Sequence, residues 1–396
     1  MDEKKIEASK KDAIVKETYE KIYDFQGKGY AAKKQSTDIK KWLEKQDDVE
    51  SVSVYGDTDI TVKFKDKTQV GILLNRKKIY GGGSKKNLDV DYSQPNFSAG
   101  IEDPHPISQD AAVIDTLRDD WPPISTPDDI INLLKGAGYD VDNIQNDSAS
   151  LQFFATLDDN EYGVVFIRSH GGMMNVAGDD KLHIMVRPFF TSFPPTSGYT
   201  GVGVFTVGTD VLPQGYAYAY AFNDGFVKKY MNNKNFPNSL FHLLVCHGGD
   251  PLAQNDMIKA FLDRCVGCYT GWTQNASLAH GDPAAVQFFQ VLCDSNATPP
   301  NTAIDAINQI AASGHSPDPQ TGASLVAYGA NAMQLIGCYI IKEVSRISIQ
   351  TPSGTVIGKG FHDILDAVEY STNLIIGGKY PRLRIFQNVD LKKVQW

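Results

Sequence analysis

Two short apolar runs, each ending at a polar corner with glycines, dominate the hydrophobic pattern of the chain. The first covers residues 162–167 and leads into His170, and the second covers residues 240–245 and leads into Cys246. Runs of this length, rich in Val, Ile, Leu and Phe, predict strands that are buried on both faces. Ligands of open α/β sheets bind at the carboxyl ends of such strands. The pattern therefore predicts a histidine and a cysteine at a ligand-binding edge of one sheet.

Strands and helices alternate around these two runs, which is typical of a parallel sheet. Before His170, the pattern predicts strands over 111–115 and 139–144 and helices over 126–136 and 148–154. After Cys246, it predicts a strand over 265–273, late strands over 338–342 and 383–386, and helices over 253–262, 283–292 and 302–312. Between the two runs, three predicted strands within residues 173–238 indicate an inserted antiparallel β-element.

The first 75 residues follow a different pattern. Apolar residues at helical spacing predict helices over 3–26 and from 36 onward, and alternation predicts strands over 49–55, 60–64 and 70–74. Residues 1–75 are therefore predicted to be a small α+β module. Residues 76–108 have the composition of a basic, exposed linker, and residues 109–396 form the predicted main domain.

Composition and charge narrow the function classes. The chain is 42% hydrophobic and 21% charged, with a net charge of -9, which argues against a nucleic-acid partner. No apolar run approaches the roughly 20 residues of a membrane span. The charged N-terminus has no apolar signal segment, so a cytoplasmic location is expected, or a secreted one if a signal has been removed. Five cysteines, an odd number, do not indicate a disulfide framework.

A cysteine and a histidine at neighbouring strand ends suit nucleophilic catalysis, because an imidazole can generate the reactive thiolate. His247 adjoins Cys246, but successive strand residues point to opposite faces, so it is expected to support the site or to face solvent. Cys265 and Cys268 have no second pair to complete a zinc site, which favours core cysteines. No metal or cofactor is expected.

The order of these segments resembles the caspase–gingipain–legumain superfamily of cysteine peptidases. Ser-His-Gly at 169–171 matches its histidine motif, a cysteine and glycine follow a second strand, and Tyr-Thr-Gly-Trp at 269–272 follows a third. Leu-Val precedes Cys246 where caspases have Gln-Ala, so the chain looks more like the bacterial gingipain and clostripain branch. The resemblance covers roughly residues 110–345. His170 and Cys246 are 76 positions apart (246 − 170), wider than the ~50 of caspases, and the β-insertion accounts for the excess.

The resemblance implies a mostly parallel sheet flanked by helices, with His170 and Cys246 as a catalytic dyad. The backbone N–H groups of Gly171 and Cys246 would bind the oxyanion. The segment after the third strand would pair with a peptide substrate and wall its first pocket. Its residues are Tyr269, Thr270, Gly271, Trp272 and Thr273.

An acid that binds a basic P1 residue is expected in the loop after the first strand of the main domain. The candidates are Asp115, Asp119 and Asp120, and a basic P1 residue is favoured over an acidic one. Arg118 and Arg168 are available to bind an acidic P1 residue, but the sequence does not identify one arginine for that role.

The expected function is that of a cysteine endopeptidase acting on peptides or proteins through an acyl-enzyme. Two alternatives stay open: a catalytically silent binding module of the same fold, and a hydrolase or transferase acting on a non-peptide amide or thioester. An open edge strand beside Cys246 would favour a peptide. Residues 1–75 would be a prodomain of a zymogen, a recognition domain or an intramolecular inhibitor.

Overall fold

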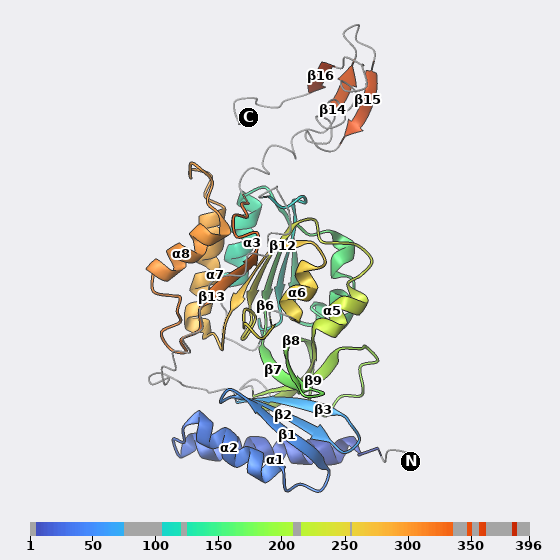
Figure 1. Cartoon of the computed structure of the whole chain (residues 1–396), viewed down its shortest axis with the longest axis vertical. Coiled ribbons are helices and arrows are strands. Elements are labelled where there is room, and N and C mark those ends of the chain that lie inside the picture. The colour runs from blue at the N-terminus through green and yellow to red at the C-terminus, as the bar shows by residue number, and fades with distance from the viewer. Residues whose placement is uncertain are drawn as a thin grey trace.

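The computed structural model describes residues 5–74, 105–119, 125–208, 215–253 and 256–335, and three strands between residues 347 and 385. Two sheets, of six and seven strands, form the body of these residues, and a third sheet has three strands. Figure 1 shows the six-stranded sheet between helices, with the seven-stranded sheet below it and the N-terminal helices at the lower end. The chain is thus a mixed α/β protein, as predicted.

The six-stranded sheet is mostly parallel, in the order β13-β12-β11-β6-β4-β5. Only β13 runs antiparallel to its neighbour. Buried Val, Ile, Leu and Phe side chains fill both faces, each stabilising the fold by roughly 1.5–3 kcal/mol. The strands are β4 (Asp110–Asp115), β5 (Asp140–Gln145), β6 (Val164–Arg168), β11 (Ser239–Leu244), β12 (Val266–Trp272) and β13 (Leu325–Gly329).

Helices cover both faces of this sheet (Figure 1). One face packs against α3 (Thr126–Gly136), α7 (Leu278–Leu292) and α8 (Ala303–Ala312). The other packs against α4 (Leu151–Ala155), α5 (Asp224–Tyr230) and α6 (Met257–Leu262). Short helices η1 (Asn146–Ser148) and η2 (Leu157–Asn160) flank α4. Local signals fix several helix starts: α3 has a proline in its first turn, and a capping box of Thr302 and Asp305 begins α8.

The seven-stranded sheet joins two parts of the chain that the sequence predicts as separate units. Its order is β1-β2-β3-β9-β10-β8-β7. The N-terminal strands are β1 (Val49–Tyr55), β2 (Asp59–Phe64) and β3 (Gln69–Leu73), and the insertion supplies β7 (Gly171–Val176), β8 (Asp179–Phe190), β9 (Val202–Gly208) and β10 (Tyr216–Phe222). The insertion strands pair antiparallel with one another, as predicted. The junction is the parallel pair β3–β9, in which Val70 lies opposite Val204.

This sheet curls until its edge strand β7 reaches β2. The Met173 amide donates to Asp59 Oδ2 (2.8 Å) and the Asn175 amide donates to Thr61 Oγ1 (3.0 Å). Apolar side chains that include Met174 and Phe205 fill the interior of the curl. Since β7 begins directly after His170, the N-terminal strands lie against the predicted site.

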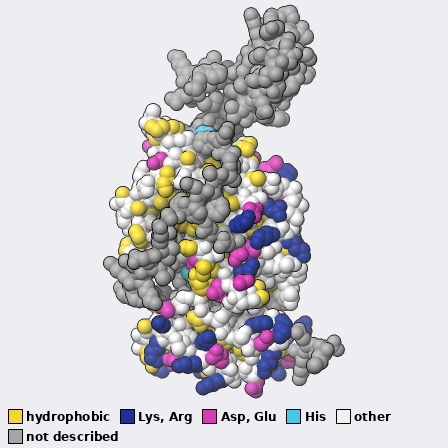
Figure 2. All heavy atoms as spheres, viewed as in Figure 1, with side chains coloured by type: hydrophobic (Ala, Val, Ile, Leu, Met, Phe, Trp, Pro, Cys, Tyr) yellow, Lys and Arg dark blue, Asp and Glu magenta, His cyan; other side chains and the backbone are white. Residues whose placement is uncertain are grey.

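Helices α1 (Ala8–Gly27) and α2 (Ala32–Leu43) pack on the outer face of the N-terminal strands. Their exposed faces carry Lys–Asp and Lys–Glu pairs four residues apart. Figure 2 shows basic and acidic side chains intermixed over this end of the molecule. Both signs of charge therefore alternate over this face.

The C-terminal strands β14 (Ile347–Gln350), β15 (Val356–Phe361) and β16 (Arg382–Ile385) form the three-stranded antiparallel sheet. The predicted strand over 338–342 and most of the predicted linker over 76–108 lie outside the described residues. Within the described ranges, every helix is too short or too polar to cross a lipid bilayer.

Candidate active site

His170 and Cys246 follow neighbouring parallel strands at the same sheet edge. In the β6–β11 pair, Arg168 lies opposite Leu244, and the Ser169 amide donates to the Leu244 carbonyl (3.2 Å). Both predicted dyad residues stand two positions beyond this pair. A Cβ atom added to Gly171 would lie 2.6 Å from the Cys246 carbonyl oxygen, so the two backbones are in contact. The fold thus brings together the two segments that the sequence singles out.

Cys246 lies in a tight turn, residues 245–249, hereafter the Cys246 turn. Its Sγ is half-buried and lies 3.8 Å from the Ala276 carbonyl oxygen, to which the thiol donates. Burial raises the pKa of this thiol to about 12, and the nearby carboxylates of Asp59 and Asp318 add to the rise. The resting thiol is therefore protonated at neutral pH and needs a base to become a nucleophile.

His170 is half-buried at the start of β7, and its carbonyl accepts a hydrogen bond from the Met185 amide (3.0 Å). Burial lowers the pKa of its imidazole to about 4, and the Arg168 guanidinium contributes to the fall. At neutral pH the ring is uncharged. An uncharged imidazole is able to accept a proton, which is the state required of a general base.

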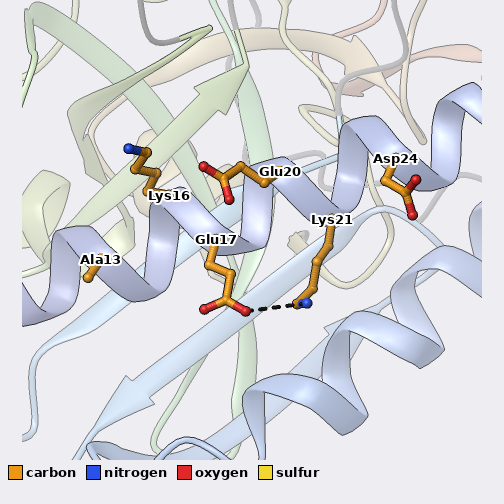
Figure 3. A pocket seen from close by; sticks show the side chains of 6 residues that line it. All are labelled: Ala13, Lys16, Glu17, Glu20, Lys21 and Asp24. Atoms are coloured by element: carbon orange, nitrogen blue, oxygen red, sulfur yellow. Dashed lines mark ion pairs between the residues drawn. The ribbon is translucent and has the colours of Figure 1, made fainter.

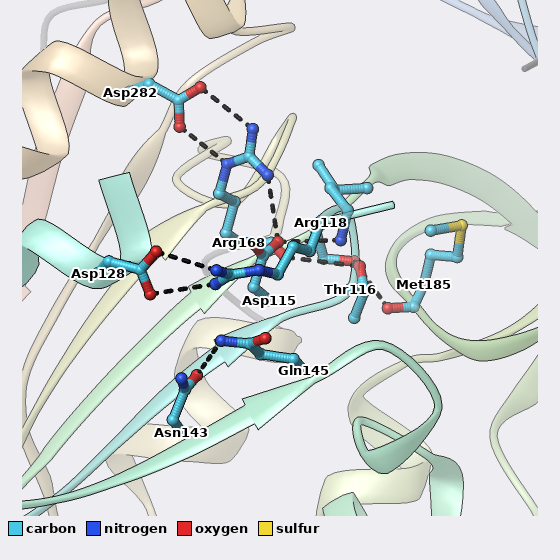
Figure 4. A network of polar contacts seen from close by, with 11 residues as sticks. Asp115, Thr116, Arg118, Asp128, Asn143, Gln145, Arg168, Met185 and Asp282 are labelled. Atoms are coloured by element: carbon cyan, nitrogen blue, oxygen red, sulfur yellow. Dashed lines mark hydrogen bonds and ion pairs between the residues drawn. The ribbon is translucent and has the colours of Figure 1, made fainter. Parts of the chain in front are cut away.

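A buried ion network centres on Arg168, two residues before His170 in the sequence (Figure 4). Asp282 of α7 binds the Arg168 guanidinium through both carboxylate oxygens, at 2.8 Å and 3.1 Å. Asp115, at the end of β4, accepts a hydrogen bond from Arg168 Nη1 at 3.1 Å. All three side chains are at least 93% buried, with exposures of 1%, 2% and 7%.

This network changes what can be expected of the predicted pocket residues. The Asp115 carboxylate faces Arg168, not an open pocket, because the buried guanidinium holds it. For the same reason Arg168 is not available to bind an acidic P1 side chain. Arg118 pairs with Asp128 at the surface (2.9 Å and 3.1 Å). Asp119 is exposed and 3.7 Å from Arg187, while Asp120 lies outside the described residues.

The segment predicted to line the substrate groove is in the interior. Strand β12 lies between β11 and β13, so both its edges are hydrogen-bonded within the sheet. The Trp272 side chain is fully buried, and so are Tyr269 and Thr270. Thr273, just after the strand, donates its amide to the Ser324 carbonyl (2.9 Å). A peptide substrate therefore cannot pair with residues 269–272 as expected, because β13 already occupies that edge of β12.

The same segment instead supports the Cys246 turn. The Tyr269 hydroxyl donates to the Gly248 carbonyl (2.8 Å), and the Gly249 amide donates to the Trp272 carbonyl (2.8 Å). A Cβ atom on Gly271 would lie 2.6 Å from the Gly248 carbonyl carbon, so only glycine permits this approach. These residues therefore fix the position of the Cys246 turn relative to β12.

Sequence reasoning missed a polar cluster that joins the Cys246 turn to the N-terminal strands. His247 is buried, with Nδ1 3.0 Å from Asp250 Oδ2 and Nε2 3.7 Å from Asp59 Oδ2. The Tyr55 hydroxyl donates to the same Asp250 oxygen (2.9 Å). His247 thus faces two carboxylates and not solvent. Asp59 precedes His247 by nearly half the chain, and no local pattern marks it.

The two cysteines of the Cys-x-x-Cys pair differ in their surroundings: Cys268 is buried in the core and Cys265 is exposed. In the described ranges, no three His, Cys, Asp or Glu side chains are grouped as a metal ion would require.

Two shallow hollows in the described surface are lined by neither His170 nor Cys246. The first, on the outer surface of α1, is lined by alternating charges and is bridged by the Lys21–Glu17 pair at 3.3 Å (Figure 3). The second runs between α3 and α7 and has Asp129, Asp282 and His315 in its lining. Neither contains His170 or Cys246, so the candidate site is defined by the strand ends alone.

Comparisons with known proteins give only a distant likeness. No family model matches the chain, and no curated protein matches it. Among solved structures, it is similar to the Arg-specific cysteine proteinase gingipain R, with 10% identity and a TM-score of 0.38. It is also similar to the complex of Porphyromonas gingivalis RgpB pro- and mature domains, with 12% identity and a TM-score of 0.38. Each match covers 71% of this chain and 62% of the other, less than two thirds of its length. A likeness this distant does not bear on the chemistry of this chain.

Proposed function

We propose that the chain is a cysteine peptidase in which Cys246 is the nucleophile and His170 the general base. The observation that carries the proposal is the register of β6 and β11, in which both residues stand two positions beyond one strand pair and Gly171, next to His170, lies against the Cys246 carbonyl. Neighbouring parallel strand ends are where an open α/β sheet binds its ligand.

The reaction would begin with transfer of the Cys246 thiol proton to the His170 imidazole. The thiolate attacks the scissile carbonyl carbon, and the carbonyl oxygen becomes an oxyanion that accepts hydrogen bonds from the Gly171 and Cys246 amides. The C–N bond then breaks and His170 returns the proton to the leaving amine. Water, deprotonated by His170, hydrolyses the thioester and restores the thiol.

The substrate would be a peptide with a basic P1 residue. Asp115 cannot supply an uncompensated charge, because Arg168 neutralises it. Asp119 pairs with Arg187 only at 3.7 Å and keeps 60% of its side chain exposed, so it remains the favoured acid among the described candidates. It follows the first strand of the sheet and so belongs to the same edge as the dyad.

A silent binding module is the second candidate, and two observations favour it. The Cys246 thiol is half-buried with a raised pKa, and β13 covers the sheet edge on which a peptide was expected to pair. Both features are those expected of a protein that binds a ligand at this edge without a reaction at Cys246.

The test is covalent labelling with a peptidyl chloromethyl ketone that carries Arg at P1. We expect one label per chain on Cys246, none on Cys246→Ala, and a rate at least about 100-fold lower in His170→Ala, since a positioned base contributes 10²–10⁴-fold. Exposed Cys265 provides the matched control: Cys265→Ser should leave the labelling of Cys246 unchanged. Absence of labelling in the folded protein would favour the binding module, and an unchanged rate in His170→Ala would refute the dyad.

A further inference from the structure

The buried carboxylate of Asp59 connects the two segments that carry the dyad. Its Oδ2 atom accepts a hydrogen bond from the Met173 amide at 2.8 Å, three residues after His170. The same oxygen lies 3.7 Å from His247 Nε2, one residue after Cys246. Asp59 belongs to β2, in the N-terminal strands, yet it touches both sides of the site.

We propose that Asp59 is a positioning residue that, through His247, fixes Cys246 relative to His170. This inference rests on the proposed function. In this role the N-terminal strands support catalysis. If they were an intramolecular inhibitor, they would instead block access to the site.

The backbone of the Cys246 turn explains why His247 needs a partner. His247 has φ of 61°, a left-handed conformation that side-chain-bearing residues adopt at a cost. Its amide donates to the Gln274 carbonyl (3.1 Å), its Nδ1 is hydrogen-bonded to Asp250 (3.0 Å), and its Nε2 lies at ion-pair distance from Asp59 (3.7 Å). The side-chain contacts therefore stabilise the backbone conformation that presents Cys246.

Three of the groups that face His247 favour its charged form: Asp59 from β2, Asp250 directly after the turn, and Asn275 from the loop after β12. The Tyr55 ring of β1 packs against the imidazole at 5.4 Å. Burial opposes the imidazolium, but the Asp250 hydrogen bond and the two carboxylates outweigh burial and raise the pKa of His247. Burial raises the pKa of Asp59 and the His247 charge opposes that rise, so the imidazolium and the Asp59 carboxylate stabilise each other.

Asp59 is itself firmly placed. Thr58 Oγ1 donates to Asp59 Oδ1 (2.8 Å) and accepts from Asn275 Nδ2 (2.8 Å). A Cβ atom on Gly172 would lie 2.9 Å from Asp59 Oδ2, so glycine is needed for the carboxylate to come this close. Because these contacts fix the position of Asp59, we expect a substitution of Asp59 to displace the segments that carry the dyad.

The test compares Asp59→Asn with Asp57→Asn, an exposed acid two residues away in the same hairpin. The readout is the rate of Cys246 labelling by the P1-Arg chloromethyl ketone. We expect Asp59→Asn to lower this rate by about 10- to 100-fold, the loss typical of small displacements of reacting groups. Asp57→Asn should stay within about twofold of wild type, as surface changes do.

A double-mutant cycle separates positioning from general damage. In a His170→Ala background, Asp59→Asn should cause little further loss, because Asp59 acts through the placement of the Cys246 thiol relative to that base. If Asp59→Asn does not fold, His247→Asn carries the test, since Asn tolerates the left-handed conformation but has no positive charge.

Three outcomes would overturn the inference: an unchanged rate in Asp59→Asn, losses that multiply fully in the double variant, or a faster rate. The last would show that the N-terminal strands inhibit the site. If His170→Ala alone had no effect, the proposed function would fail instead, so the two failures can be told apart.

Discussion

Arg168→Met is the substitution whose effect the structure predicts most sharply. Methionine keeps the apolar stem of the arginine but removes the guanidinium, which donates three hydrogen bonds to two carboxylates. Asp115 and Asp282 would then be buried together without a counter-charge, with 2% and 7% of their side chains exposed. Removing one partner of a buried ion pair costs about 3–5 kcal/mol.

That loss is a large part of the roughly 5–15 kcal/mol that stabilises a folded protein. Urea unfolding followed by tryptophan fluorescence and far-UV circular dichroism measures it. Arg118→Met is the matched control, because Arg118 also binds a carboxylate through two hydrogen bonds but lies at the surface. With its two side chains 35% and 47% exposed, this pair should contribute no more than about 1 kcal/mol.

A third variant tests the cause of the loss. Adding Asp115→Asn and Asp282→Asn to Arg168→Met removes the uncompensated charges and should recover part of the lost stability. The reasoning would be refuted if Arg168→Met and Arg118→Met destabilised equally, or if the triple variant were less stable than Arg168→Met alone.

Two further predictions concern the dyad segments. Gly171→Ala places a methyl group 2.6 Å from the Cys246 carbonyl oxygen, so we expect a loss of about 1–3 kcal/mol in urea unfolding, together with slower labelling of Cys246. Gly136→Ala, at a helix position with open space around it, is the control, and an equal effect of both would contradict the packing argument. The raised pKa of His247 means that its charge stabilises the fold fully below the unfolded pKa of about 6.5 and progressively less as pH rises through the higher folded value. The stability difference between wild type and His247→Asn should therefore shrink between pH 6 and pH 9, and a difference that grows would reverse the assigned sign.

The parts of the fold that sequence reasoning predicts are those that local pattern determines. The strands ending at Arg168 and Leu244 are continuous apolar runs, and such runs have few alternatives to a buried strand. Their shared edge follows from the βαβ rhythm, so the meeting of the His170 and Cys246 segments could be predicted without coordinates.

What could not be predicted depends on pairing between distant residues. An acid at the end of β4 is visible in the sequence, but its partner Arg168 and the second acid Asp282 come from different elements. The apolar run of β12 indicates a strand and does not say whether another strand covers its edge. The part played by Asp59 depends on the β3–β9 junction, which joins segments with no shared pattern.

That junction has a consequence for how the protein is made. Strand β3 leaves the ribosome roughly 130 residues before its partner β9, which at 5–20 residues per second is an interval of roughly 6–26 s. During it, Val70 and Ile72, both destined for the interior, belong to a strand with an unpaired edge. The N-terminal strands therefore cannot mature before the insertion has been synthesised. Fragments that stop short of β9 should collect in inclusion bodies or bound to chaperones, whereas chains that extend past β10 should be recovered in soluble form.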